Sequence, residues 1–381
     1  MTTTPSVTTV ETKPRVLVAM SGGVDSSAVC LLLQDQGYEV VGMTMRVYDL
    51  PRQFEDESDE PDFIRSAREL AARLGIEHHV VDARTDFREQ IVRYFLDEYE
   101  AGRTPNPCVR CNRDFKFRLM AECADRFGCT LMATGHYVKT EEGTDGYTYL
   151  LMGDDLRKDQ SYFLWRVPQA TLRRCVFPLG TMEKPQVRAY LNEKGFTQRS
   201  RQSESMEICF VEGDYRDFLR EQRPDCASRC QGGRYVNTLG QTIGQHEGVP
   251  FYTVGQRKGL GIALGYPAYV LRLNAAKNTI VLGKEEDLQA TAFFAEDDCL
   301  VHPEAFFAST TLSVRIRYHS APIACQVTRL EDGRLLVRTL QPVQAITPGQ
   351  SAVFYEGKRM VGGAVIARQN GIGEYLSLIH I

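Results

Sequence analysis

The sequence lacks the features that mark a membrane or exported protein. No apolar run approaches the roughly 18 residues that a membrane-spanning helix needs. The first 15 residues, MTTTPSVTTVETKPR, contain neither an apolar core nor early arginines, so no secretory or mitochondrial signal is visible. We therefore expect a cytoplasmic protein with no membrane partner, whose residues 1–13 form a disordered tail.

Internal repeats and low-complexity segments are also missing, and the formal net charge is only −4 over 381 residues. The charge is unevenly distributed, because acidic residues predominate in 49–100 and basic residues in 102–118 and 173–234. Such a distribution permits a polyanionic partner on one face, although charge runs are commonly just solvated surface.

The eleven cysteines are an odd number scattered along a long chain, which argues against a disulfide framework. Most of them lie in apolar or amphipathic segments, where cysteine behaves as a small hydrophobic residue. Cys108 and Cys111 differ, because they follow a Pro-Asn-Pro loop inside a basic run. Together with Cys226 and Cys230 they have spacings that occur in zinc sites, so a zinc site is one alternative.

Short apolar runs alternate with helical patterns in the first part of the chain, which predicts an α/β fold with a doubly wound parallel sheet. We expect strands at 15–20, 40–45, 78–83 and 130–135, and helices at 26–36, 63–74, 86–100 and 115–127.

From about residue 215 the pattern changes to short glycine-rich strands and then to hairpins. We expect a small, mixed, linker-like central domain at 214–288 and an antiparallel β-barrel at 289–371. The last six residues, LSLIHI, resemble a translated sequencing adapter, so 376–381 are excluded as a probable artefact; a real, slightly apolar tail is the alternative.

A glycine loop, AMSGGVDSS, follows the first predicted strand and precedes a helix, an arrangement that favours anion binding. It has neither the lysine of a Walker loop nor the spacing of a dinucleotide fingerprint. It resembles the loop of the PP-loop ATP pyrophosphatases, which implies an adenylating domain at 14–213 that uses ATP and Mg²⁺. The residues that would bind ATP are Ala19, Met20, Ser21, Gly22, Gly23, Val24, Asp25 and Ser26, with Ser27 as a further phosphate donor. Asp25 would orient Mg²⁺ or the loop itself. The alternative is that AMSGGVDSS is a generic glycine turn after a strand, with no role in binding.

Further motifs distinguish between the families that share the PP-loop. The chain carries, in order, PNPCVRCN followed by KF, ATGHY (133–137), KDQSYFL (158–164), EICF (207–210), YTVGQRKGLG (252–261) and TPGQSAVFY (347–355). This set resembles the tRNA-specific 2-thiouridylases over nearly the whole chain. The resemblance implies a tRNA-uridine 2-sulfurtransferase that adenylates the C2 oxygen of the wobble uridine and replaces it with sulfur.

The resemblance also implies roles for two cysteines. Cys209 would carry a persulfide, and Cys111 would act on it as acid and attacking thiol, leaving a Cys111–Cys209 disulfide. Thiolate reactivity depends on a lowered pKa, which nearby cations favour. We therefore expect Arg110, Arg113 and Lys116 to lower the pKa of Cys111.

The resemblance implies roles for further positions, and some of these residues also have a purely structural explanation. Met45 and Gly135 would contact the nucleotide, and a helical part at about 165–200 would contact tRNA. The residues expected at the tRNA or its target base are Asn106, Pro107, Cys108, His136, Lys158, Asp159, Gln160, Arg317, Tyr318 and Gln350. Met45 could simply pack in the core, Asp159 could cap a helix, and the barrel residues could be solvated surface.

Three alternatives stay open. Cys108, Cys111 and Cys209 could hold a [4Fe–4S] cluster, since relatives vary between Asp and Cys at position 108. The chain could instead be an amide-forming PP-loop enzyme, or a non-catalytic tRNA-binding scaffold. The preferred interpretation is free thiols with no metal, a sulfur-donor relay protein or cysteine desulfurase as partner, and tRNAs for Lys, Glu and Gln as substrates.

Overall fold

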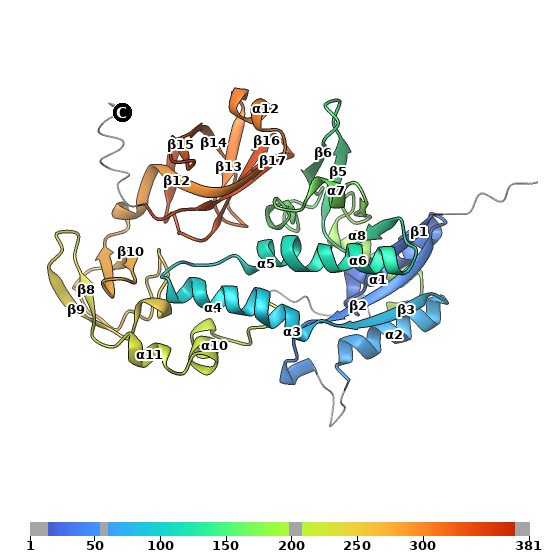
Figure 1. The fold of residues 1–381 in the computed structure, drawn as a ribbon, viewed down its shortest axis with the longest axis horizontal. Coiled ribbons are helices and arrows are strands. Elements are labelled where there is room, and N and C mark those ends of the chain that lie inside the picture. Colours follow the sequence, from blue (N-terminus) through green and yellow to red (C-terminus); the bar gives the residue numbers. More distant parts are fainter. Residues whose placement is uncertain (1–13, 54–59, 198–207, 370–381) are drawn as a thin grey trace, which may run out of the picture.

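The computed structural model describes residues 14–53, 60–197 and 208–369. The predicted tail at 1–13 and the hexapeptide at 376–381 lie outside these ranges. The described chain forms an α/β part, a small central part and a C-terminal barrel (Figure 1). The predicted fold class is therefore confirmed.

A five-stranded sheet, entirely parallel and ordered β3-β2-β1-β4-β7, forms the N-terminal part. Its strands are β1 (Arg15–Ala19), β2 (Glu39–Arg46), β3 (Glu77–Asp82), β4 (Leu131–Ala133) and β7 (Cys175–Val176). The apolar runs predicted the first four. The segment 165–200, expected to be helical, contains α7 (Gln169–Leu172) and α8 (Lys184–Glu193), and the two-residue strand β7 lies between them.

Helices cover both faces of this sheet, as a doubly wound fold requires. Val16 and Val18 of β1 share one core with α1 (Val24–Asp35), α2 (Asp62–Leu74) and α8. Leu17 points to the opposite face and packs in the core that contains α6 (Phe117–Arg126). Because side chains alternate along a strand, a continuous apolar run such as RVLVA is buried on both sides.

Two helical stretches leave the sheet and run toward the other parts (Figure 1). The first consists of α3 (Arg84–Phe87), the π-helical η2 (Arg88–Val92) and α4 (Arg93–Glu100). The second consists of α5 (Pro107–Arg110), the π-helical η3 (Cys111–Lys116) and α6. The helix predicted at 115–127 was therefore too short, because a proline at the first helical position starts it at residue 107.

The central part is a packed unit rather than a linker. It contains α10 (Tyr215–Gln222), α11 (Cys226–Arg229) and a mixed sheet ordered β10-β11-β8-β9. The strands are β8 (Gly233–Val236), β9 (Thr242–His246), β10 (Tyr269–Asn274) and β11 (Thr279–Gly283). Buried residues of this unit, such as Tyr235 and Val270, share a core with Phe95 of α4.

Six antiparallel strands form the C-terminal barrel, and pairing of β12 with β17 closes it. They are β12 (Gln289–Leu300), β13 (Leu312–Arg315), β14 (Ile323–Arg329), β15 (Leu335–Gln344), β16 (Ser351–Glu356) and β17 (Arg359–Ile366), with α12 (Pro303–Ala308) after β12. The predicted antiparallel barrel is confirmed.

A hairpin of the α/β part, β5 (Val138–Glu142) and β6 (Thr148–Met152), extends the sheet of the barrel. Leu150 of β6 pairs with Met360 of β17. The sequence analysis missed this hairpin, although Asp145-Gly146 is a turn signal and Gly146 has a φ of +79°. Within the described ranges no helix is both long and apolar enough to cross a bilayer.

Candidate active site

The glycine loop lies between the end of β1 and the start of α1, and its own serines order it. The main-chain N–H of Ser21 donates to Oγ of Ser26 at 3.2 Å, and Oγ of Ser27 donates to the carbonyl of Gly23 at 2.7 Å. Gly22 has a φ of +72°, and a Cβ there would lie 2.5 Å from the carbonyl oxygen of Phe63. Only glycine fits this position.

The start of α1 lies at the glycine loop, and the first N–H groups of a helix, which have no acceptor within it, are groups that can bind an anion. Gly135, after β4, closes the other side, since a Cβ there would lie 2.9 Å from Cβ of Asp25. Met20 is buried and donates its main-chain N–H to Met43 at 2.7 Å, and Met45 is half-buried at the end of β2. Ala19 is half-buried and Val24 is buried. A cradle lined by glycines beside a helix start fits a nucleotide phosphate.

Asp25 is held by two residues that the sequence analysis did not select. Nζ of Lys184 lies 2.7 and 2.8 Å from the two carboxylate oxygens of Asp25, and the hydroxyl of Tyr137 donates to one of them at 2.8 Å. Lys184 is the first residue of α8, and its side chain is almost fully buried. It places a cation beside a loop that has no Walker lysine. The sequence pattern that could have drawn attention to Lys184 is the helix start EKPQ, where Glu183 and Gln186 form a capping box.

The fold brings three cysteines from distant segments to one place. Cys108 is the second residue of α5, Cys111 begins η3, and Cys209 comes from the segment before α10. Cys111 lies close enough to Cys108 and Cys209 that a thiolate at either position would raise the pKa of Cys111. All three are free thiols, and Cys108 and Cys209 are exposed. A π-helical turn beginning at Cys111 is a feature that occurs often at functional sites.

The surroundings of these thiols raise their pKa values, which corrects our expectation of a lowered pKa. Cys209 reaches solvent, but the protein packed around its thiol removes hydration and raises its pKa to about 12; the same loss of hydration raises the pKa of Cys111 strongly. The ammonium of Lys116 opposes this effect, and its own pKa is lowered by burial. Arg110 and Arg113 instead pair with Asp114, at 3.4 and 3.3 Å.

No group of three or more His, Cys, Asp or Glu side chains within the described residues is arranged to hold a metal ion. The four cysteines of the zinc alternative are all described, and they do not form such a group. Cys226 instead lies on α11, where its thiol interacts with that of Cys230.

His136 follows β4 and is buried. Its Nδ1 lies 2.7 Å from Oγ1 of Thr134, and its ring stacks on Phe117 with centroids 5.9 Å apart. Burial, together with the charge of Lys116, holds the pKa of His136 well below its usual value. The imidazole is therefore neutral at physiological pH.

The segment Lys158-Asp159-Gln160 is placed differently from our expectation. Asp159 is buried and forms an ion pair of 2.8 Å with Arg315, so it does not face an RNA surface. Its carboxylate also accepts the N–H of Ser161 at 3.1 Å, but the N-cap of the short helix that begins at Ser161 is Gln160, so Asp159 is not the cap residue of the alternative. Gln160 accepts the N–H of Tyr137 at 3.1 Å, and Lys158 is half-buried.

Three barrel residues expected at tRNA also contact the protein. The exposed Arg317 donates to the carbonyl of Ala345 at 2.8 Å, and Tyr318 packs on Phe163 with ring centroids 4.5 Å apart. The side chain of Gln350 donates to the carbonyls of Thr104 and Pro105, just before the cysteines. Asn106 and Pro107, which follow, are buried.

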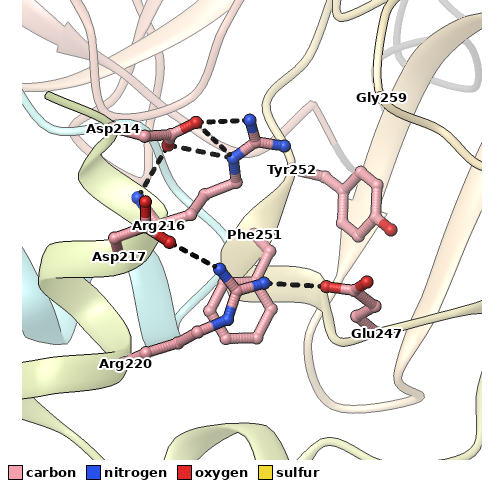
Figure 2. A pocket seen from close by; sticks show the side chains of 8 residues that line it. All are labelled: Asp214, Arg216, Asp217, Arg220, Glu247, Phe251, Tyr252 and Gly259. Carbon is pink, nitrogen blue, oxygen red and sulfur yellow. Dashed lines mark hydrogen bonds and ion pairs between the residues drawn. The ribbon is translucent and has the colours of Figure 1, made fainter.

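Figure 2 shows a charged pocket between α10 and residues 247–259 of the same central part. Its volume is about 290 Å³, and Tyr252 and Gly259 of the YTVGQRKGLG motif line it. Its charges pair with one another: Arg216 binds Asp214, and Arg220 binds Asp217 at 3.0 Å and Glu247 at 2.8 Å. A second hollow, of about 560 Å³, shares Asp214 and Arg216 and is also lined by Ile208, the neighbour of Cys209. The lining of the first pocket has three carboxylates and two guanidiniums that pair within it, so its formal net charge is −1 and both cations are engaged.

Comparisons with known proteins match the three parts. The tRNA methyl transferase HUP domain family matches residues 14–213, the tRNA methyl transferase PRC-barrel domain family matches 217–284, and the aminomethyltransferase β-barrel domain family matches 290–366.

Curated relatives align along almost their whole lengths. The chain is 58% identical to tRNA-specific 2-thiouridylase MnmA 3 of Bacteroides fragilis, covering 95% of this chain and 97% of that protein. The protein of the same name from Phocaeicola vulgatus is 57% identical, with 94% and 96% covered. tRNA-specific 2-thiouridylase MnmA of Cytophaga hutchinsonii is 41% identical, with 93% and 97% covered.

Proposed function

This chain belongs to the tRNA-specific 2-thiouridylase family, and from that premise we propose how its residues divide the reaction. The glycine loop would bind ATP for adenylation of the wobble uridine of tRNA, and Cys209 and Cys111 would deliver sulfur to the activated base. The observation that carries this division is the convergence of Cys111 with Cys209 in a fold that also builds a phosphate loop. A uridine C2 carbonyl is a poor electrophile, so activation and sulfur attack need separate groups.

In the adenylation step, we assign the phosphates to the start of α1 and to Ser21, Ser26 and Ser27. The C2 oxygen of uridine attacks the α-phosphorus, a P–O bond breaks, and pyrophosphate leaves. Mg²⁺ would accompany ATP and neutralise phosphate charge. We assign Asp25 to ordering the loop, because Lys184 and Tyr137 already engage its carboxylate.

In the sulfur step, Cys209 would enter as a persulfide. The sulfur of Cys111 attacks Sγ of Cys209, the persulfide S–S bond breaks, and the proton of Cys111 goes to the departing sulfide. The sulfide attacks C2 of the adenylated uridine, and AMP leaves with the former C2 oxygen. The products are 2-thiouridine, AMP and a Cys111–Cys209 disulfide, which an external thiol must reduce.

The raised pKa acts in opposite directions on the two roles of Cys111: it favours proton donation and, because the thiolate is the nucleophile, it slows the attack. Because Cys111 keeps its proton at neutral pH, it can supply that proton to the departing sulfide. Lys116 is the nearby cation that would stabilise the thiolate as the proton leaves. Neutral His136 beside Lys116 adds no competing charge.

The finer identity of the partners is also part of this proposal. The substrates would be tRNAs for Lys, Glu and Gln, and the sulfur would come from a relay protein or cysteine desulfurase in the cytoplasm. Cys209 is exposed, as transfer from a separate protein requires. Lys158, Arg317 and Tyr318 remain the candidate RNA contacts, since they keep surface that is open to solvent.

The test is reconstitution with unmodified tRNA, ATP, Mg²⁺ and a persulfide donor, followed by nucleoside mass spectrometry. We expect 2-thiouridine together with one AMP for each sulfur transferred. An amide-forming enzyme would instead consume ATP with ammonia and leave the tRNA unchanged, which would overturn the assignment.

A further inference from the structure

A turn of the barrel, residues 347–350, lies directly on the segment that leads into the two cysteines. The main-chain N–H of Thr104 donates to the carbonyl of Pro348 at 2.8 Å. In return, Nε2 of Gln350 donates to the carbonyls of Thr104 at 3.0 Å and Pro105 at 3.1 Å. These bonds connect residues that are about 245 positions apart, so they exist only when the barrel is docked.

The turn is shaped to this segment. Gly349 has a φ of +93°, and a Cβ there would lie 2.8 Å from the carbonyl oxygen of Thr104 and 3.1 Å from Cβ of Arg103. Any other residue at 349 would push the two segments apart. On the far side of the segment, Oγ1 of Thr104 donates to Oγ1 of Thr253 in the central part at 3.3 Å. The segment is thus held between two other parts of the molecule.

The segment needs outside partners because of its prolines. Pro105 and Pro107 have no N–H, so local main-chain hydrogen bonding is limited just where helix α5 begins. Carbonyls that are largely buried must find donors elsewhere, and the amide of Gln350 supplies two N–H groups. Cys111 follows Pro107 by four residues, about one helical turn, so a shift at the helix start carries the thiol with it.

We propose that Gln350 is a positioning residue for Cys111: it clamps the main chain of residues 104–105 and thereby sets where the continuous helix of α5 and η3 presents the thiol. This proposal rests on the proposed function for Cys111 as the attacking thiol. The amide nitrogen is donated to the protein, so only the amide oxygen of Gln350 could serve the separate role of accepting a hydrogen bond from tRNA.

The experiment compares Gln350→Leu, which removes both donors, with Gln350→Lys, which keeps N–H donors. Gln326→Leu is the matched control, since Gln326 is an exposed glutamine on strand β14 of the same barrel. Iodoacetamide labelling of Cys111 is followed by peptide mass spectrometry without ATP or tRNA, with the exposed Cys299 as internal reference and the buried Cys30 as a check of folding.

We expect Gln350→Leu to change the labelling rate of Cys111 by about threefold or more relative to Cys299, with Gln350→Lys and Gln326→Leu close to wild type. Single-turnover thiolation at saturating tRNA should fall by about tenfold or more, because small displacements of reacting groups are costly. The dissociation constant for tRNA should stay within about twofold of wild type. Loss of about 1.4 kcal/mol of binding energy would instead raise it tenfold.

Unchanged labelling of Cys111 in Gln350→Leu would overturn the proposal, as would Gln350→Lys behaving like Gln350→Leu. Weaker tRNA binding with normal labelling and normal single-turnover thiolation would make Gln350 an RNA contact. Labelling of Cys111 does not depend on thiolation activity. Absence of thiolation in the wild-type protein would therefore contradict the proposed function, while the labelling rates of the variants could still be compared.

Discussion

The carboxylate of Asp159 and the guanidinium of Arg315 form an ion pair of 2.8 Å whose side chains are only 1% and 9% exposed. The pair joins the segment after the β5–β6 hairpin to β13 of the barrel. Beside it, the hydroxyls of Ser161 and Tyr355 lie 3.0 Å apart, and Nε1 of Trp165 donates to Oγ of Ser351 at 3.1 Å. The barrel is thus attached to the catalytic part by buried polar contacts as well as by strand pairing.

Arg315→Met should destabilise the protein by about 3–5 kcal/mol, because it leaves the Asp159 carboxylate buried without a partner. Urea unfolding followed by tryptophan fluorescence measures this, since Trp165 is the only tryptophan and lies at the same interface. Arg329→Met is the control: the pair of Arg329 with Asp298 is partly exposed, so its loss should cost below about 1 kcal/mol. Equal shifts of the two midpoints would contradict the prediction.

Cys209→Ser should abolish thiolation and leave ATP-dependent adenylation of tRNA measurable, because carbonyl activation does not need the persulfide. Pyrophosphate release and nucleoside mass spectrometry report the two steps separately. Cys299→Ser, the same change at another exposed thiol, should leave both steps intact. Loss of adenylation as well, in a folded Cys209→Ser protein, would mean that Cys209 has a structural role.

The strands of the parallel sheet could be predicted because both of its faces are covered. Val16, Leu17 and Val18 are all buried, so the run reads as a strand without any knowledge of its neighbours. Strand β7 could not be found in this way, because two residues are too few to show a period. The start of α5 was open to prediction, since Asn106-Pro107 is a helix-start signal, but the flanking Pro105 made the stretch resemble a turn.

Site residues that belong to local motifs could be selected from the sequence. Their contacts with residues far away in the chain could not be predicted. The glycine loop and the three cysteines were found from their own sequence. The partners of Asp159 and Gln350 lie 156 and about 245 residues away, so their engagement appears only in the fold. Lowered thiol pKa values were expected from nearby basic residues. Two of these, Arg110 and Arg113, instead pair with Asp114, and desolvation outweighs the effect of the third, Lys116.

Ser26→Ala should lower kcat/KM for ATP by about tenfold or more, a transition-state cost of about 1.4 kcal/mol, and should leave tRNA affinity unchanged. Oγ of Ser26 accepts the N–H of Ser21, so its removal loosens the loop without touching the barrel. Pyrophosphate release at varied ATP and filter binding of tRNA measure the two effects. Ser228→Ala on exposed α11 should change neither, and a parallel loss of tRNA binding in Ser26→Ala would refute the loop assignment.

The labelling rate of Cys209 by iodoacetamide should rise about tenfold per pH unit from about pH 7 to 9.5, without a plateau. The reason is that a pKa of about 12 keeps this thiol protonated throughout the range, so each unit of pH multiplies the small thiolate fraction by ten. Glutathione in the same reaction should level off near its ordinary thiol pKa of about 8.5–9. A plateau for Cys209 below about pH 9 would show that its pKa is not raised.

Cys108→Asp distinguishes a mechanism based on free thiols from one based on an iron–sulfur cluster. If Cys108 only occupies the exposed second position of α5, a carboxylate there should be tolerated, and acidic residues are favourable in the first turn of a helix. We expect thiolation within roughly tenfold of wild type, a transition-state cost below about 1.4 kcal/mol. Cys111→Asp, the same change three residues later, should eliminate thiolation under either mechanism, so it controls for the assay.

Iron and labile-sulfide analysis of anaerobically purified protein completes this test. A cluster would need all three thiolates of Cys108, Cys111 and Cys209, and exchanging one for a harder carboxylate ligand should lose or weaken the iron. We expect no stoichiometric iron in the wild-type protein, because sulfur transfer through Cys209 and Cys111 requires only thiols and an external reductant. Near-stoichiometric iron and sulfide in wild type, lost together with activity in Cys108→Asp, would replace the persulfide steps by a cluster-bound sulfide.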